Sequence, residues 1–285
     1  PPPPTGDTDG VNTTGAWGIP LLPVRAGMKV LGYTNFDETR TLGQGFGPFL
    51  SRIWDAKREG GPDSSTRGTY SATHTYEERA SLGRFFVHSA MSGADQRVHN
   101  PLGKIHYVYA PVSRFGKLGE SFVQFTCRFP LIDGRKMAHL HWNQGKEVNG
   151  EIDIPEGQLD GGSDKGNMFV HYYLSDRQDT TRLHLSLQAR HHFGCYFRRK
   201  GFRGASDPGE IIGFVDGRQV YRLNSSAGIP DGMFHVMQFE TYLRSGSQKI
   251  PGWDALFGAA DGTGPGYRGA AGSGWAEYDK FRIDG

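Results

Sequence analysis

The segment 150–157 limits the fold of this chain more than any other, because it combines features that a helix does not accept. It has a glycine at each end, a proline at position 155 and isoleucines between its acidic residues. Glycine and proline are the poorest helix formers, and an interior proline removes a helical hydrogen bond. The segment is therefore predicted to be a β-strand. A proline inside a sheet is tolerated at a bulge, so we expect a β-bulge near Ile154-Pro155.

Three carboxylates lie in this strand, at Glu151, Asp153 and Glu156. In a regular strand residues i and i+2 share a face, so Glu151 and Asp153 point the same way. Glu156 would fall on the other face, but one extra residue in a bulge returns it to the first. All three acids are thus predicted to line one face. Because like charges repel and resist burial, such a cluster in an apolar strand indicates a function.

Paired carboxylates on one face are the usual apparatus of glycoside hydrolysis. In a retaining mechanism one attacks the anomeric carbon, and the other, roughly 5–5.5 Å away, protonates the leaving oxygen and then activates water. The intervening aspartate could hydrogen-bond the nucleophile, or keep the acid/base protonated by like-charge repulsion. A calcium site or a solvated polar face is the alternative, but Ile152 and Ile154 favour a packed strand over a flexible calcium loop.

The pattern Glu-x-Asp-x-x-Glu at 151–156 resembles the bulged signature of glycoside hydrolase family 16. The resemblance implies a retaining, endo-acting enzyme on an all-β fold: a concanavalin A-like β-jelly-roll sandwich of two antiparallel sheets with a concave substrate cleft. It assigns Glu151 as the nucleophile, Asp153 as its assistant and Glu156 as the acid/base. Further segments resemble the family at 122–129, 138–142, 211–217 and 275–283.

Two positions depart from the family pattern. Pro155 replaces the apolar residue that is usual there, and Met137 stands where the family has a tryptophan. The first hundred residues match the family poorly. These departures leave the three catalytic assignments intact and leave the substrate subtype open.

Composition agrees with a turn-rich all-β fold. The 285 residues include 42 glycines and 16 prolines, with few stretches of helical periodicity. The composition of residues 1–16 predicts a flexible arm, and residues 17–285 are assigned to one catalytic domain. Within that domain, residues 55–69 and 245–274 are predicted to be loops. A formal net charge of +2 gives no electrostatic argument for nucleic acid, and no apolar run is long enough to cross a membrane.

Aromatic and histidine residues near the acidic strand are candidates for substrate binding. Trp142 and Trp253 could stack on a sugar ring, although a tryptophan also packs well in a core. His171, in the strand expected to follow the acidic one, matches a histidine that the resembled family has near its catalytic strand. His141 shares a strand face with His139; the two could bind zinc or copper, but polar cleft residues are favoured.

Two short basic runs, His191-His192 and Arg198-Arg199-Lys200, form a local patch. The patch could bind an anionic or sulfated polysaccharide. The alternative is a solvated strand edge whose charges prevent edge-to-edge pairing.

No cofactor is expected for catalysis. By the family resemblance, Asp279 is expected to help bind a structural calcium ion on the convex side, with Asp37 and Glu38 as candidate partner ligands near the N-terminus. The chain has two cysteines, Cys127 and Cys195. A disulfide and two free thiols are both open, because Cα separation governs the bond.

These features together predict a secreted, monomeric hydrolase that cleaves a β-linked polysaccharide by double displacement. A β-1,3-glucan of the laminarin type is the first substrate hypothesis, and a galactan such as agar or carrageenan is the second. A lectin-like sandwich without turnover is the alternative outside enzymes, and a polysaccharide lyase on the same architecture is a third hypothesis. Three acids on one face favour hydrolysis over both.

Overall fold

The computed structural model contains β-strands and no helix among the residues that it describes. Accordingly, none of these residues belongs to a helix long and apolar enough to span a membrane. The described residues are 18–34, 40–41, 54–57, 69–70, 76–81, 84–89, 106–109, 111–128, 135–142, 150–159, 165–172, 174–187, 189–224, 229–242 and 276–285. The predicted arm 1–16 and the predicted loop 245–274 lie outside them.

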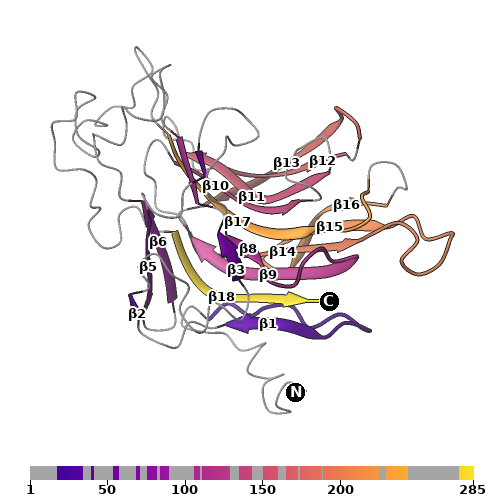
Figure 1. Ribbon diagram of the computed structural model, residues 1–285, viewed down its shortest axis with the longest axis horizontal. Helices are drawn as coiled ribbons and strands as arrows, with labels where there is room; N and C mark the ends of the chain where they lie inside the picture. Colours follow the sequence, from indigo (N-terminus) through magenta and orange to yellow (C-terminus); the bar gives the residue numbers. More distant parts are fainter. Residues whose placement is uncertain are drawn as a thin grey trace.

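The strands form two sheets that stack face to face (Figure 1). Sheet A has the order β16 (Arg218–Leu223), β15 (Glu210–Val215), β14 (His191–Arg198), β9 (Glu120–Arg128), β18 (Ala276–Asp284), β6 (Arg84–Ser89), β5 (Tyr76–Ser81) and β2 (Arg40–Thr41), with β1 (Val30–Thr34) beside β18. Sheet B has the order β13 (Gln178–Ser186), β12 (Lys165–His171), β11 (Glu151–Leu159), β10 (Arg135–Trp142), β17 (Phe234–Tyr242), β7 (His106–Tyr109) and β4 (Thr69–Tyr70), with β8 (Pro111–Ser113) beside β17 and β3 (Trp54–Lys57) beside β8.

All strand pairs are antiparallel except β4 with β7. Neighbours in a sheet are often distant in sequence: β9 lies between β14 and β18. The C-terminal strand is therefore near the centre of sheet A, where it closes the sandwich. Such long-range antiparallel pairing is expected of a two-sheet sandwich.

The apolar core fills the space between the sheets. Alternate residues of facing strands supply it, because successive side chains of a strand point to opposite faces. The core members from sheet A include Val123, Phe125, Phe193, Cys195, Ile211, Phe281 and Ile283, and those from sheet B include Ile152, Ile154, Met168 and Val170. Cys127 and Cys195 are both buried here as free thiols.

A clasp of two tyrosines closes one side of the sandwich, where the edge strands β13 and β16 meet. Asp179 Oδ2 accepts hydrogen bonds from the hydroxyls of Tyr172 and Tyr221, each at 2.8 Å. Arg177 lies over the Tyr172 ring at 4.3 Å and donates to Asp179 Oδ1 at 3.4 Å. One carboxylate on sheet B thus binds the edge of sheet A.

The N-terminal segment 18–29, here called the strap, covers the outer face of sheet A (Figure 1). Leu22 and Met28 of the strap pack against a second apolar cluster, formed by Phe122, Tyr196 and Ile212. Both faces of β9 are consequently buried, as its uninterrupted run of buried residues from Ser121 to Cys127 shows. Sheet A is therefore enclosed on both faces where the strap covers it.

The predicted strand 150–157 is confirmed as β11, and the segments 122–129, 138–142, 211–217 and 275–283 each contain part of a strand. Sequence reasoning did not identify β2, β5, β6 or β16. The structure also shows short strands β3 and β4 at the two ends of the predicted loop 55–69. Both lie at sheet edges, where a few backbone hydrogen bonds suffice to define a strand and leave little hydrophobic pattern in the sequence.

Candidate active site

The predicted bulge lies in β11 between Asp153 and Glu156. On one side, Asp153 pairs with Leu140 and Glu156 with Ala138 of β10, so three steps on β11 face two on β10. The register shift recurs against β12 on the other side. One extra residue is thus inserted at Ile154-Pro155, whose peptide bond is cis. The expectation of a bulge at this proline is confirmed.

The register places all three acids on the outer face of sheet B. Their partners on β12 are every second residue of that strand: His171 faces Glu151, Phe169 faces Asp153, and Asn167 faces Glu156. Directly paired residues of antiparallel strands share a face. The alternate residues of β11, Ile152 and Ile154, and of β12, Met168 and Val170, lie in the core. The bulge therefore returns Glu156 to the face of the other two acids.

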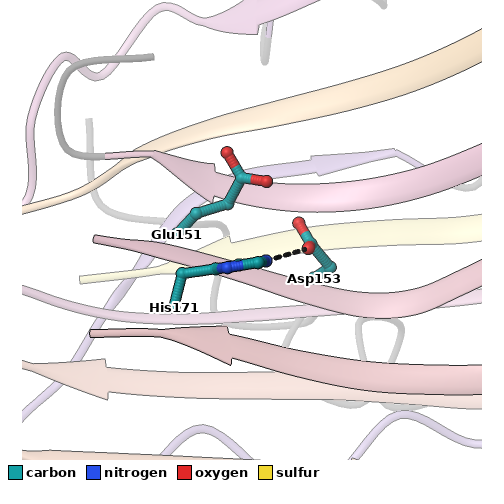
Figure 2. Close-up of side chains that lie close together, drawn as sticks. All are labelled: Glu151, Asp153 and His171. Carbon is teal, nitrogen blue, oxygen red and sulfur yellow. Dashed lines mark ion pairs between the residues drawn. The ribbon is translucent and has the colours of Figure 1, made fainter. Parts of the chain in front are cut away.

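Glu151, Asp153 and His171 form a compact group (Figure 2). One polar atom of each lies within 4.8 Å of the other two. His171 Nε2 is 3.6 Å from Asp153 Oδ2. Asp153 is 1% exposed and Glu151 7% exposed, whereas His171 and Glu156 are partly exposed. Two nearly buried carboxylates thus lie beside an imidazole that reaches them from the next strand.

Two local features hold this group in position. The ring of Phe169 lies nearly parallel to that of His171, with ring centroids 6.4 Å apart and an interplanar angle of 24°. Gly150, directly before Glu151, has a φ of +89°. A Cβ at this position would approach Pro230 to 3.0 Å. Only glycine combines this backbone conformation with such close packing at low cost, so the glycine that begins the segment also sets the approach to Glu151.

The donor set allows two kinds of chemistry. Carboxylates on one face can act as nucleophile, acid and base toward a sugar linkage. Two carboxylates with an imidazole could also bind a divalent metal ion. Ile152 and Ile154 are buried in the core on the reverse side of the strand, which gives the acids a rigid base rather than a flexible calcium loop. The rigid bulged strand fits the first chemistry better.

The other predicted binding residues lie in different surroundings. Trp142 pairs with Glu151 in the backbone register, and its side chain, like all of Trp253, lies outside the described residues. His141 pairs with Ile152 and is 2% exposed, on the core side of sheet B. Its ring contacts that of His235 edge to face, with centroids 4.6 Å apart. Burial lowers the pKa of His141 to about 4, although the backbone at Ile152 opposes the shift.

His141 is therefore not brought to the acids, contrary to the expectation that it binds substrate. The reason is the alternation of a strand: an imidazole one position from a residue on the site face must point to the other face. His171 is brought to the acids, as expected. The side chain of His139 lies outside the described residues.

Three of the five residues in the predicted basic patch are bound within the fold, whereas Lys200 is exposed. His191 contacts Asp216 Oδ2 at 2.7 Å and the Ser186 carbonyl at 3.1 Å. His192 is 1% exposed. Arg198 makes two hydrogen bonds to Asp207, at 2.9 and 3.0 Å. These three side chains are bound within the fold, and the partners of His191 and Arg198 lie 5 to 25 residues away, brought close by turns whose geometry the sequence pattern does not show.

A set of polar residues beside the acids escaped sequence reasoning. The outer face of sheet B continues from β11 across β12 to the edge strand β13, whose residues alternate between exposed and inward positions. On β13, Gln178 pairs with His171, Thr180 with Phe169 and Arg182 with Asn167. The alternation of 178–186 is visible in the sequence, but the register that places it beside Glu156 is not.

The outer face of sheet A does not fit the expected calcium ion. Lys280, fully buried next to Asp279 in the chain, donates to the Ile19 carbonyl at 2.7 Å. Arg282 donates to the Leu22 carbonyl at 2.6 Å and pairs with Asp284 at 2.9 Å. A divalent cation would face two buried positive charges here, and these donors already occupy the strap carbonyls. The side chain of Asp279, and Asp37 and Glu38, lie outside the described residues.

No family model and no curated protein matches this sequence. Solved structures do match. β-Agarase A from Zobellia galactanivorans is 14% identical with a TM-score of 0.60, over 95% of this chain and 98% of that chain. Porphyranase B from the same organism is 14% identical with a TM-score of 0.58, over 92% and 95%.

A β-1,3-glucanase from Mycobacterium marinum is 18% identical with a TM-score of 0.53, over 91% of this chain and 100% of that chain. Sequence identities this low support a similarity in fold alone. The chain thus has the two-sheet fold of the β-jelly-roll enzymes of glycoside hydrolase family 16, as its signature at 151–156 predicted.

Proposed function

We propose that this protein is a retaining, endo-acting hydrolase of a β-linked polysaccharide. The observation that carries the proposal is the bulge at Ile154-Pro155, which places Glu151, Asp153 and Glu156 on one face of sheet B, the face away from the core. Clustered carboxylates destabilise a strand because like charges repel, so their presence indicates that a function requires them. A retaining glycosidase requires such a cluster, and a sugar-binding face without turnover does not.

Catalysis proceeds by double displacement. Glu151 attacks the anomeric carbon of the sugar while Glu156 donates a proton to the departing glycosidic oxygen. A covalent glycosyl-enzyme forms. Glu156 then removes a proton from water, which attacks the same carbon and releases Glu151 with net retention of configuration. Two carboxyl groups suffice for these steps, and no metal ion or organic cofactor takes part.

Asp153 and His171 position the nucleophile. Asp153 lies on the same face as Glu151, two residues away. His171 Nε2 is 3.6 Å from Asp153 Oδ2. When Glu151 is esterified to the sugar its charge disappears, and the neighbouring carboxylate then no longer faces a like charge. Relief of the repulsion between the two acids therefore favours formation of the glycosyl-enzyme.

The substrate hypotheses are a β-1,3-glucan first and a galactan second. The solved structures named above include a β-1,3-glucanase, a β-agarase and a porphyranase, which supports keeping both classes. Because a polysaccharide is too large to enter a cell intact, we also propose that the enzyme acts outside the cell. It is proposed to act as a monomer, with the polymer as its binding partner.

A reducing-sugar assay on laminarin, lichenan, agarose, κ-carrageenan and xyloglucan tests the function. Wild type should cleave at least one polymer, and Glu151→Gln and Glu156→Gln should lose activity by on the order of 10³-fold. Asp176→Asn, which changes an exposed acid in the β12–β13 turn, is the matched control and should keep full activity. Full activity in both glutamate variants would refute the assignment.

Chemical rescue separates the two glutamates. Added azide should restore turnover to Glu151→Ala and give a glycosyl azide of inverted configuration, because the small anion replaces the missing nucleophile. In Glu156→Ala, azide should act in the second step and give the retained product. Reversed products would exchange the two roles.

A further inference from the structure

Arg182 lies on the face that carries the catalytic acids. It pairs with Asn167 across β12–β13, and Asn167 pairs with Glu156 across β11–β12. Glu156, Asn167 and Arg182 therefore form one row across three adjacent strands. Two strand spacings correspond to roughly 10 Å. Arg182 is exposed and stands on β13, two strands away from Glu156.

The charge of Arg182 is not used within the described part of the chain, where it has no hydrogen-bond or ion-pair partner. Other arginines differ: Arg177, Arg198 and Arg222 each pair with a carboxylate. Among the described residues, no ion pair joins Arg182 to the acids of the site.

The neighbours of Arg182 on the exposed side of β13 are neutral hydrogen-bonding groups. Gln178 Nε2 donates to Thr180 Oγ1 at 3.0 Å, and both side chains are exposed. His184 follows Arg182 on the same strand and is exposed as well. Hydroxyl, amide and imidazole groups suit sugar hydroxyls. A single guanidinium among them adds a selective contact for an anion, because it can bind two oxygens of one planar or tetrahedral group.

We propose that Arg182 forms an anion-binding subsite for a sulfate ester or carboxylate on a sugar beyond the one that is cleaved. The inference rests on the proposed function and reverses its order of substrates: an acidic polysaccharide, such as a sulfated galactan, is favoured over the neutral β-1,3-glucan that the sequence put first. The alternative role for an exposed arginine on an edge strand is to prevent edge-to-edge pairing with another sheet. That role predicts no dependence on the charge of the polymer.

The test compares Arg182→Gln with wild type on polymers that differ in charge. On κ-carrageenan, or another sulfated galactan that wild type cleaves, kcat/KM should fall about tenfold or more, as expected for a lost hydrogen bond to a charged group. On agarose the two proteins should differ by less than twofold. Arg218→Gln, at another exposed arginine of an edge strand, β16, removes the same charge on sheet A and should behave as wild type on both.

Retardation of the protein in native gels that contain each polymer measures binding, and this measurement does not require that the polymer is cleaved. Wild type should be retarded by a sulfated or uronate polymer more than by agarose, and Arg182→Gln should lose that difference. Retardation by κ-carrageenan alone indicates a sulfate, and retardation by polygalacturonate alone indicates a carboxylate. If no polymer is cleaved but this charge-dependent retardation is present, the proposed hydrolysis fails and the subsite stands.

Three results would overturn the subsite. The first is an equal loss in Arg182→Gln on charged and neutral polymers. The second is the same loss in Arg218→Gln, which would show a general effect of net charge. The third is the absence of retardation by any acidic polymer in wild type. Arg182→Lys, which keeps the charge without the two-pronged geometry, should fall between wild type and Arg182→Gln.

Discussion

The two outer faces of the sandwich both carry charged side chains, but in opposite surroundings. On sheet A, the cations of Lys280 and Arg282 are covered by the strap and bound by its carbonyls. On sheet B, Glu151 and Asp153 lie close together beside His171. The first arrangement satisfies each charge and stabilises the fold. The second brings two nearly buried carboxylates together, which costs stability.

The comparison predicts that the two clusters can be changed independently. Charges on sheet B should control activity and leave stability unchanged or improved. Charges on sheet A should control stability and leave the activity of the folded protein unchanged.

The largest effect is expected from Asp153→Asn on sheet B. Activity should fall by on the order of 10²-fold or more, because the group that positions Glu151 loses its charge. The free energy of unfolding should stay the same or rise, since repulsion with Glu151 is relieved. Turnover and urea unfolding of the same sample measure both. A clear fall in the free energy of unfolding of Asp153→Asn would show that the charges on sheet B also stabilise the fold, and the distinction between the two sheets would fail.

The second effect is a dependence of stability on pH that arises under the strap. Burial lowers the pKa of His192 to about 4, with Asp216 opposing and Arg282 and Lys280 reinforcing the shift. The folded state then binds fewer protons than the unfolded state, whose pKa is near 6.5. The contribution of His192 is complete above pH 6.5 and is lost as the pH falls toward 4, by about 3 kcal/mol.

Asp284, in the same layer, has the opposite sign. Burial raises its pKa to about 6 although Arg282 opposes the shift, so its carboxyl destabilises the fold as the pH rises through 4 to 6. Both proteins contain Asp284, so its contribution cancels when the free energy of unfolding of wild type is subtracted from that of His192→Gln. This difference should rise by about 3 kcal/mol as the pH is lowered from 7 to 4. His184→Gln, at an exposed histidine, should show no such change.

The third effect is a loss of stability in Lys280→Met. The substitution leaves the Ile19 carbonyl without its donor at 2.7 Å, and the free energy of unfolding should fall by about 1–3 kcal/mol. Amide hydrogen exchange should quicken in the strap, residues 18–29, and kcat should not change. Lys200→Met, at an exposed lysine, is the control. Unaltered exchange in the strap would show that Lys280 does not hold it.

Added calcium tests the role of the two cations under the strap in the wild-type protein. Because Lys280 and Arg282 supply the positive charge under the strap, neither added calcium nor a chelator should change Tm. A rise in Tm with calcium would show that a divalent ion binds to the fold after all.

The smallest effect is expected at the clasp between the sheet edges. Burial alone would raise the pKa of Asp179, but hydrogen bonds from Tyr221 and Tyr172, together with Arg177, hold it below the usual value. Its stabilising contribution is therefore present above the ordinary carboxyl range and is lost only as the pH falls below it. Because Asp179 is partly exposed, Asp179→Asn should cost only about 1 kcal/mol at pH 7, measured by urea unfolding.

The acidic strand β11 was predictable because the features that define it are local in the sequence. Pro155 makes a bulge probable within a few residues, and that bulge alone determines whether Glu156 joins Glu151 and Asp153. By contrast, the roles of His141 and His171 depend on register. Both are histidines in strands next to β11, yet one lies opposite Ile152 in the core and the other opposite Glu151 at the site. A shift of one residue would exchange them.

The sequence by itself determined the all-β class, the bulged strand, its three acids and, through the signature at 151–156, the fold family. These depend on backbone preferences and on spacings of a few residues. Only the tertiary structure decided which charges are free and which are bound. It paired Arg198 with Asp207, fixed Lys280 and Arg282 to the strap, and placed Arg182 in the row of Glu156. The energy of a charge depends on what surrounds it, and the surroundings of Lys280 and Arg282 include carbonyls of the strap that precede them by 260 residues or more.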